Sequence, residues 1–181
     1  MQPATPSVAA DLPVRLLATQ SEPQDAPESC AEDVAAGRIA VHVERVVVEK
    51  RARRLSLWFA GYPVREFHVA LGREPVGDKQ HRGDARTPEG HYVIDGRNGG
   101  SAFHRSLHIS YPNAADVRSA RDAGASPGGE IMLHGLPEDA AWVGREHWRF
   151  DWTEGCIAVT NEEIDEIWEL VPDGTPIEIR P

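Results

Sequence analysis

Short stretches of apolar residues, alternating or continuous, recur along the chain from about residue 41 to its end. Residues 55–60 alternate around Trp58, and Leu107, Ile109 and Tyr111 share one face of another stretch. Alternation with a period of two is typical of half-buried strands, and Gly- and Pro-containing turns separate the stretches. The pattern predicts strands over residues 41–49, 55–60, 64–71, 91–95, 106–111, 131–134 and 175–180.

One segment near the C-terminus carries a helical pattern instead. Ile164, Ile167 and Trp168 recur at helical spacing, acidic residues open the segment, and Pro172-Asp173-Gly174 closes it. These signals predict a helix over residues 161–170, and a shorter helix is indicated over residues 113–123. Together with the strands, they predict a mainly β domain with one clear C-terminal α-helix.

Two long polar stretches interrupt the strands, over residues 72–86 and 136–152. The second holds Trp142, Trp148 and Trp152, which are three of the five tryptophans. Loops of this length in compact domains are often functional lids. We therefore expect long loops over a cleft, with Trp152 as the best candidate for a core anchor.

Residues 1–40 differ in composition from the rest of the chain. They are rich in Pro, Ala, Ser and acidic residues without sustained periodicity, which predicts a flexible lead-in before a domain over residues 41–181. No apolar run is long enough to span a bilayer. Residues 1–10 lack the basic and apolar regions of a signal peptide. An exported protein would then begin inside a longer precursor or use another route.

The formal net charge of −10 argues against one broad class of function. An acidic chain without a clustered basic face is a poor nucleic-acid binder. The dense basic cluster over residues 50–54 is expected to be a hairpin turn with solvated arginines, and the alternative is a contact with an anionic polymer. Two cysteines, Cys30 and Cys156, make no disulfide framework, and pairing them would consume the thiol of Cys156.

Residues 151–161 place Cys156 directly after Gly155, between a polar turn and a β-prone run. A thiol at such a turn is accessible to a substrate, and the N–H groups of Gly155 and Cys156 are candidate donors to an oxyanion. Upstream, an apolar strand ends in His134-Gly135. His134 is the candidate base, and the carbonyl of Gly135 is the candidate group that orients its ring. The alternative is a buried cysteine and a core histidine.

These residues resemble the catalytic signature of the L,D-transpeptidase (YkuD-type) family, which is a His-Gly at a strand end, a variable loop and then Ser/Thr-His-Gly-Cys. Here the two parts are His134-Gly135 and Thr153-Glu154-Gly155-Cys156. Thr87-Pro88-Glu89-Gly90-His91-Tyr92 resembles the family's Thr-Pro-x-Gly-aromatic turn. Asn161 falls where the family often has Asn. The resemblance covers about residues 43–180, nearly the whole predicted domain.

The resemblance implies a β-sandwich with its site in a cleft, Cys156 as nucleophile, His134 as base, and the amides of Gly155 and Cys156 as the oxyanion hole. It implies attack on the bond between a diamino acid and D-Ala in a peptidoglycan stem peptide. The acyl group passes through a thioester to an amine of another stem or of a D-amino acid. No metal or organic cofactor is implied. Peptidoglycan stems are the expected partners, the cell envelope (periplasm) is the expected location, and a monomer is expected.

Two positions depart from the family pattern. Glu154 stands where His is usual, and Ala158 stands where Arg or Asn is usual. A carboxylate facing the thiol would raise its pKa, so we predict that Glu154 points away from the sulfur and pairs with Arg149 or His147. Candidates to replace the missing charge are Arg105, Arg145 and Arg149.

Substrate contacts are expected from the cysteine turn, from one strand and from the tryptophan-rich excursion: Thr153, Glu154, His108, Tyr111, Trp142, Trp148 and Arg149. His104 and His108 lie four residues apart, a spacing that suits a metal site on a helix. On a strand, four residues span ~13 Å at about 3.3 Å each. We therefore predict no metal site there.

Three other functions compete with transpeptidation. An L,D-carboxypeptidase would use the same residues and pass the acyl group to water, and residue types alone do not separate the two enzymes. A non-catalytic peptidoglycan-binding module would have no need of both Cys156 and His134. A papain-like protease would place its cysteine before its histidine and at the start of a helix, which is the reverse of the order here.

Overall fold

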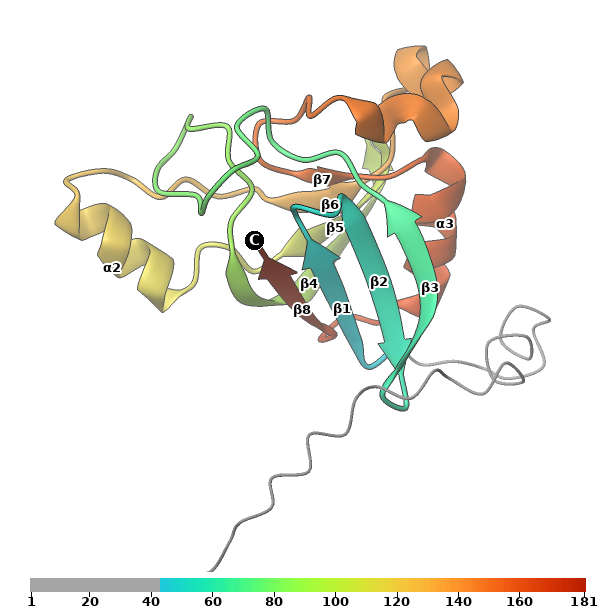
Figure 1. Cartoon of the computed structure of the whole chain (residues 1–181), viewed down its shortest axis with the longest axis horizontal. Coiled ribbons are helices and arrows are strands. Elements are labelled where there is room, and N and C mark those ends of the chain that lie inside the picture. Colours follow the sequence, from blue (N-terminus) through green and yellow to red (C-terminus); the bar gives the residue numbers. More distant parts are fainter. Residues whose placement is uncertain (1–42) are drawn as a thin grey trace, which may run out of the picture.

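The computed structural model describes residues 43–181, which form a strongly curved sheet with helical segments around it (Figure 1). The predictions for residues 1–40, with Cys30 among them, lie outside the described residues. Strands dominate the described part of the chain, which confirms the mainly β fold class. Within residues 43–181, no helix is long and apolar enough to cross a membrane.

Eight strands join in one sheet, in the spatial order β3-β2-β1-β8-β4-β5-β6-β7. Neighbouring strands are antiparallel except for the pairs β1–β8 and β6–β7, which are parallel. Because pairing connects all eight strands, their division into the two layers of a sandwich stays a prediction. The strands are β1 (Arg45–Glu49), β2 (Arg54–Phe59), β3 (Tyr62–His68), β4 (Gly90–Ser101), β5 (His104–Ile109), β6 (Met132–His134), β7 (Ile157–Ala158) and β8 (Pro176–Arg180).

The two edges of this sheet meet. The chain that leaves β3 at one edge pairs with β7 at the other, because Ala70 and Ala158 exchange both backbone hydrogen bonds, at 3.0 and 2.9 Å. A second bridge joins Gly72 to Thr153. The curled sheet encloses an apolar core that includes Leu57, Ile94, Leu133 and Ile157. This closure also satisfies edge groups that would otherwise be exposed.

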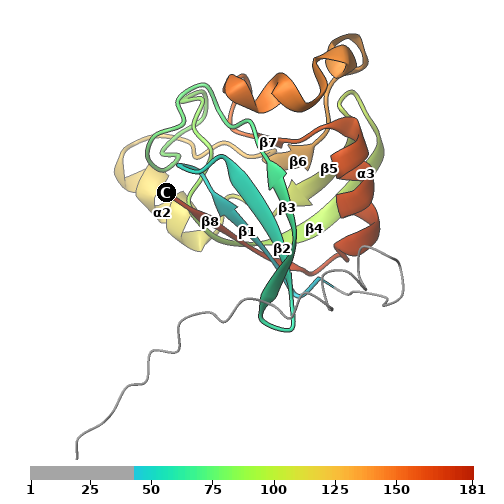
Figure 2. The ribbon, with the colours of Figure 1, turned by 45° about the vertical axis from the view of Figure 1, so that its right-hand side comes forward.

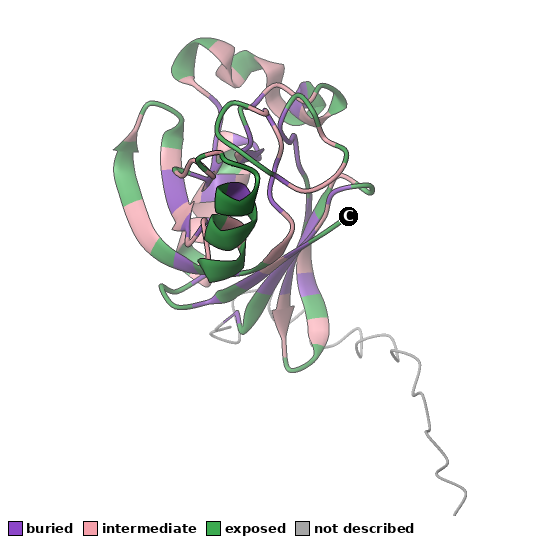
Figure 3. Ribbon diagram, turned by 90° about the vertical axis from the view of Figure 1, so that its left-hand side faces the viewer, coloured by how far each residue is buried: buried purple, intermediate pink, exposed green. Residues whose placement is uncertain are grey.

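Both predicted helices are present. Asn113 caps α2 (Ala114–Asp122), and Thr160 caps α3 (Asn161–Leu170), each with a reciprocal capping box. Figure 2 shows α3 lying along the sheet, where it packs against β5 and β6. Its buried residues are Ile164 and Ile167, as the spacing predicts. In contrast, α2 stands at the surface with mostly exposed residues (Figure 3).

The tryptophan-rich excursion is not an irregular loop, so this part of the sequence interpretation is wrong. Residues from Glu138 to Arg149 form η1, two short 3₁₀ pieces joined at Gly144, where φ is 53° and ψ is −137°. Pro137 precedes the first piece, and its ring restricts the backbone φ at the point where the chain enters the helix. The ring of Trp148 stacks on His68 at 4.6 Å, whereas Trp142 is 84% exposed.

The basic cluster forms the β1–β2 hairpin as predicted, but its cations are not all solvated. Lys50 is 2% exposed, and its ammonium donates to the carbonyls of Gly77 and Thr87 and to the carboxylate of Glu89. A charge this deeply buried needs such partners. Lys50 therefore ties the hairpin to the long loop over residues 72–86 and to the Thr87 turn. Hydrophobic pattern alone gave no sign of this contact.

Candidate active site

The segment that carries Cys156 is fixed at its start by Asp151. The carboxylate of Asp151 accepts hydrogen bonds from the Arg53 guanidinium, at 2.9 Å from Nε, and from the backbone N–H of Leu71 at 3.0 Å. Two residues later, the N–H of Thr153 donates to the carbonyl of Leu71 at 3.1 Å. The cysteine turn is thus held against the chain that closes the sheet.

The turn before Cys156 requires glycine. Gly155 has φ of +130°, and a Cβ there would lie 2.6 Å from the carbonyl oxygen of Arg86. The hydroxyl of Thr153 donates to the carbonyl of Cys156 at 2.7 Å and accepts the N–H of Gly155 at 3.1 Å. Since this bond occupies the Gly155 amide, the proposed two-donor oxyanion hole requires Thr153 to release it. The amide of Cys156 is the other expected donor.

His134 and Cys156 come from neighbouring parallel strands. Leu133 pairs with Ile157, and His134 pairs with Ala158, two residues after the cysteine. Successive side chains of a strand alternate between its faces. With Leu133 and Ile157 in the core, His134 and Cys156 project from the opposite face and line one cavity.

The ring of His134 is held in one orientation, and its neutral form is held in one tautomer. Its Nδ1 lies 2.7 Å from the carbonyl oxygen of Gly135. A carbonyl only accepts hydrogen bonds, so Nδ1 carries a hydrogen, and in the neutral ring Nε2 keeps a free lone pair. The carbonyl of Gly135 therefore lies where it can orient the ring of the base, which is the role predicted for it.

Gly135 is itself positioned by Asn161, at the start of α3. The side-chain oxygen of Asn161 accepts the N–H of Leu136 at 2.7 Å. A Cβ on Gly135 would lie 2.5 Å from that same oxygen and 3.0 Å from a methyl of Ile164. The close approach of the helix to this turn therefore excludes any side chain at position 135.

Burial acts in opposite directions on the two reactive groups. It raises the pKa of the Cys156 thiol, and a hydrogen bond from the Met132 backbone and the charge of Lys79 offset part of this rise. It lowers the pKa of His134, against the opposing effect of the hydrogen bond to Gly135. At neutral pH the pair is therefore a thiol and a neutral imidazole. The thiol donates to the carbonyl of Glu130 at 3.6 Å, so it must turn from this partner before His134 can take its proton.

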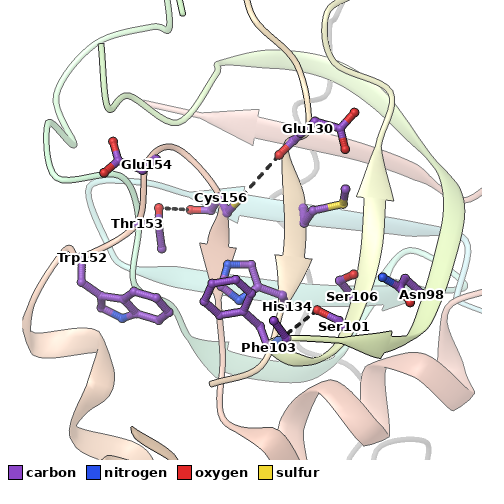
Figure 4. Close-up of a pocket in the computed structure, with 12 residues that line it drawn as sticks. Asn98, Ser101, Phe103, Ser106, Glu130, His134, Trp152, Thr153, Glu154 and Cys156 are labelled. Carbon is purple, nitrogen blue, oxygen red and sulfur yellow. Dashed lines mark hydrogen bonds between the residues drawn. The ribbon is translucent and has the colours of Figure 1, made fainter. Parts of the chain in front are cut away.

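A cavity of about 610 Å³ opens over these two residues (Figure 4). Two aromatic rings flank the imidazole of His134: Phe103 at 4.6 Å and Trp152 at 5.7 Å between ring centroids. The remaining lining comes from the β4–β5 hairpin, the strand before His134 and the cysteine turn: Asn98, Ser101, Ala102, Ser106, Glu130, Met132, Thr153 and Glu154.

Sequence analysis did not find Phe103. It lies at the tip of the β4–β5 hairpin, because β4 continues to Ser101, well past its predicted end at residue 95. The segment from Gly96 to Ser101 is polar and glycine-rich, and it reads as a loop. The sequence did offer one signal for Phe103. An aromatic residue isolated among polar residues and glycines has no local packing partner, which indicates a contact with a distant part of the chain.

Of the predicted substrate-contacting residues, Thr153 and Glu154 line the cavity and the other five do not. His108 pairs with Asp95 on the neighbouring strand. The Tyr111 hydroxyl donates to the carbonyl of Pro127 at 2.9 Å, in the core. Trp142, Trp148 and Arg149 belong to η1, and no residue of η1 lines this cavity. Trp152, which follows η1, is half-buried and lines the cavity rather than the core.

Glu154 points away from the sulfur, as predicted (Figure 4). Its partner is Arg73, from the loop after β3, so the prediction of Arg149 or His147 is wrong. Arg149 pairs with Glu146 within η1 at 2.5 Å, and His147 is buried. None of the arginines considered as substitutes for a charge at position 158 lines the cavity.

Within residues 43–181, no group of three or more His, Cys, Asp or Glu side chains is arranged to hold a metal ion. His104 and His108 pair with different carboxylates, Asp165 and Asp95.

Comparisons with known proteins show which family the chain belongs to. The sequence model of the YkuD family, described as the L,D-transpeptidase catalytic domain, matches residues 43–179. The putative L,D-transpeptidase YafK of Escherichia coli (strain K12) is 33% identical over 99 residues, which are 53% of this chain and 32% of YafK. The chain thus spans about a third of that curated relative.

Two solved structures share the fold. The helical cell shape determining protein Pgp2 from Campylobacter jejuni matches with a TM-score of 0.60 and 26% identity, over 77% of this chain and 48% of Pgp2. An L,D-transpeptidase from Mycobacterium smegmatis matches with a TM-score of 0.52 and 13% identity, over 77% of this chain and 59% of that one. The family match spans both His134 and Cys156, and the chain belongs to the YkuD family of L,D-transpeptidase catalytic domains.

Proposed function

We propose that this protein is a peptidoglycan L,D-transpeptidase that works through a thioester on Cys156. One observation carries the proposal. The thiol of Cys156 and the imidazole of His134 line one cavity, and the Nδ1–H of His134 is bound to Gly135, which leaves Nε2 as a base. A nucleophile, a base and a group that orients the base are the recurring parts of thiol acyl transfer.

The first half-reaction forms the thioester. His134 Nε2 accepts the thiol proton, and Sγ attacks the carbonyl carbon of the diamino acid to form a C–S bond. The amide of Cys156, and that of Gly155 if Thr153 releases it, would donate to the oxyanion. The C–N bond then breaks, and His134 returns its proton to the departing amine of D-Ala.

The second half-reaction regenerates the thiol. An acceptor amine loses its proton to His134 and attacks the thioester carbon, the C–S bond breaks, and the proton returns to sulfur. A cavity of about 610 Å³ beside His134 has room for more than the departing D-Ala. This space can admit an amine acceptor on a second stem peptide, which is the acceptor we propose.

The substrate and the location follow from the family, and for this chain they are part of the proposal. Peptidoglycan stem peptides would serve as donor and acceptor, and the cell envelope would be the site of action. The solved relative Pgp2 is described as determining helical cell shape. We extend to this protein only a role in remodelling the wall.

The test is intact-protein mass spectrometry after mixing the protein with purified disaccharide-tetrapeptide. Cys156→Ala is the inactive variant, and Cys30→Ala is the matched control that removes the other thiol. An adduct of the tripeptide acyl mass in wild type and Cys30→Ala, together with cross-linked dimers, is the expected result. The same adduct with only free tripeptide released would make the protein an L,D-carboxypeptidase. No adduct and no D-Ala release would overturn the enzymatic proposal.

A further inference from the structure

A second cavity, of about 650 Å³, opens on the other side of the cysteine turn. Cys156, Glu154 and Glu130 line both cavities, whereas His134, Phe103 and Trp152 line only the first. The walls of the second cavity are the long loop after β3 and the loop before β6: Lys79, Arg82, Gly83, Gly128, Gly129 and Ile131. The thiol thus stands at the junction of two spaces with different chemistry.

Only one cation in this second cavity is available to a ligand. The ammonium of Lys79 is buried and pairs with Asp84 at 2.7 Å. Arg82 is exposed, and its guanidinium has no ion-pair partner among residues 43–181. Glu154 on the rim is already neutralised by Arg73. The cavity therefore presents one free guanidinium, which suits a carboxylate.

The loop that carries Arg82 is held in place by its backbone. The N–H of Arg82 donates to the carbonyl of Ser126 at 2.8 Å. Gly128 approaches closely, since a Cβ there would lie 3.3 Å from the Cα of Arg82. Asp84 stabilises the same loop through Lys79 and the N–H groups of Gln80 and His81. Gly83, Gly128 and Gly129 line the cavity with Arg82 and add no side chains that would fill it.

The position of His134 assigns the two cavities to the two halves of the substrate. His134 must reach the leaving amine and later the attacking amine, so both amines lie in the first cavity. The acyl half, beyond the attacked carbonyl, then extends into the second cavity. That half includes the side chain of the diamino acid, whose far carbon carries a carboxylate and an ammonium.

We propose that Arg82 binds the side-chain carboxylate of the donor's diamino acid in the second cavity, a role that rests on the proposed function. Glu130 at the boundary offers a carboxylate that complements the ammonium on the same carbon. Arg82 would then supply the positive charge that is missing at position 158. That position holds Ala158, which is fully buried in the bridge to Ala70.

The experiment compares three disaccharide-tetrapeptides: one with meso-diaminopimelate, one with its side-chain carboxylate amidated, and one ending in D-alaninamide. Arg82→Gln is measured beside Arg51→Gln, a control of equal charge change on the exposed hairpin. We expect Arg82→Gln to raise KM by roughly 10- to 100-fold on the first and third stems, the size of a hydrogen bond to a charged group. On the amidated stem, wild type and Arg82→Gln should have the same KM, and kcat should change little throughout.

Three results would overturn the assignment. Arg82→Gln could change KM equally on all three stems or on none of them, or its effect on KM could disappear only on the stem that ends in D-alaninamide. A second measurement does not depend on turnover. In a Cys156→Ala background, calorimetry should show that disaccharide-tripeptide binds less tightly when Arg82 is changed or the diamino acid is amidated. If wild type turns over none of the stems, the proposed function fails, and the binding measurement alone decides the role of Arg82.

Discussion

The side-chain oxygen of Asn161 accepts the backbone N–H of Leu136 at 2.7 Å and joins the start of α3 to the turn that follows His134. Gly135 lies in that turn and supplies the carbonyl that holds the imidazole. The orientation of the base is therefore set through two residues that never touch the substrate. Asn161 is a positioning residue in this arrangement.

Replacing Asn161 with Ala should weaken both stability and catalysis. The Leu136 N–H loses its partner, which costs about 1–3 kcal/mol in the free energy of unfolding. The Gly135 carbonyl is then free to shift, so kcat should fall while KM changes little. Urea unfolding and turnover of a tetrapeptide stem measure the two effects. Asn113→Ala, which removes the cap of α2 far from the site, should cost about 1 kcal/mol without lowering kcat. Equal kcat losses in both variants would contradict the positioning role.

Gly155→Ala should abolish acylation of Cys156. A Cβ at this position would lie 2.6 Å from the carbonyl oxygen of Arg86, and the φ of +130° disfavours any other residue. Gly124→Ala is the matched control, because Gly124 also has positive φ, +68°, but nothing lies within 4 Å of its Cβ. That control should cost roughly 1 kcal/mol in stability and leave activity intact. Formation of the acyl adduct, followed by mass spectrometry, distinguishes the two.

The parts of the site that sequence predicted are those fixed by local pattern. His134 ends a strand of apolar residues, and Cys156 precedes a β-prone run, so both had to lie at strand ends. The signals at the two ends of the helix and the spacing of Ile164 and Ile167 predicted α3 with the same bounds as those observed. These features depend on neighbours in the chain.

The parts that sequence missed depend on distant contacts. Glu154 finds Arg73 only because the sheet curls until its edges meet. Lys50 is buried because three acceptors from other segments surround its ammonium. Phe103 reaches His134 because a glycine-rich hairpin pairs in spite of its composition. No period or spacing along the chain reports such contacts.

The reactivity of the Cys156 thiol should rise with pH without levelling off near neutrality. Burial raises its pKa, so the thiolate fraction is small at pH 7 and grows about tenfold for each pH unit below the pKa. Alkylation by iodoacetamide should follow this rise when measured in a Cys30→Ser background, where one thiol remains. The same protein unfolded in urea provides the reference, and its titration should occur at lower pH. A plateau of the folded protein below neutral pH would instead reveal a thiolate–imidazolium pair.

His147 should make the fold sensitive to acid. It is buried, its Nδ1 has no hydrogen-bond partner among the described residues, and burial, with the charges of His68 and His134, lowers its pKa to about 4. Because the folded pKa lies below the unfolded value of about 6.5, His147 contributes stability above that value, which is lost as the pH falls toward about 4. Between about pH 7.5 and about pH 4.5 the loss should be on the order of 2 kcal/mol.

Urea unfolding of wild type and His147→Phe at both pH values measures this contribution. Phenylalanine fills a similar volume beside Leu136 and Phe150 in the apolar cavity of about 220 Å³ that His147 lines, and it cannot be protonated. The variant should therefore match or exceed wild type at the higher pH and lose less stability at the lower one. His134, whose pKa is also lowered, remains in both proteins, so its contribution cancels in the comparison. An identical loss in wild type and His147→Phe would show that His147 is hydrated or protonated without cost, contrary to its burial.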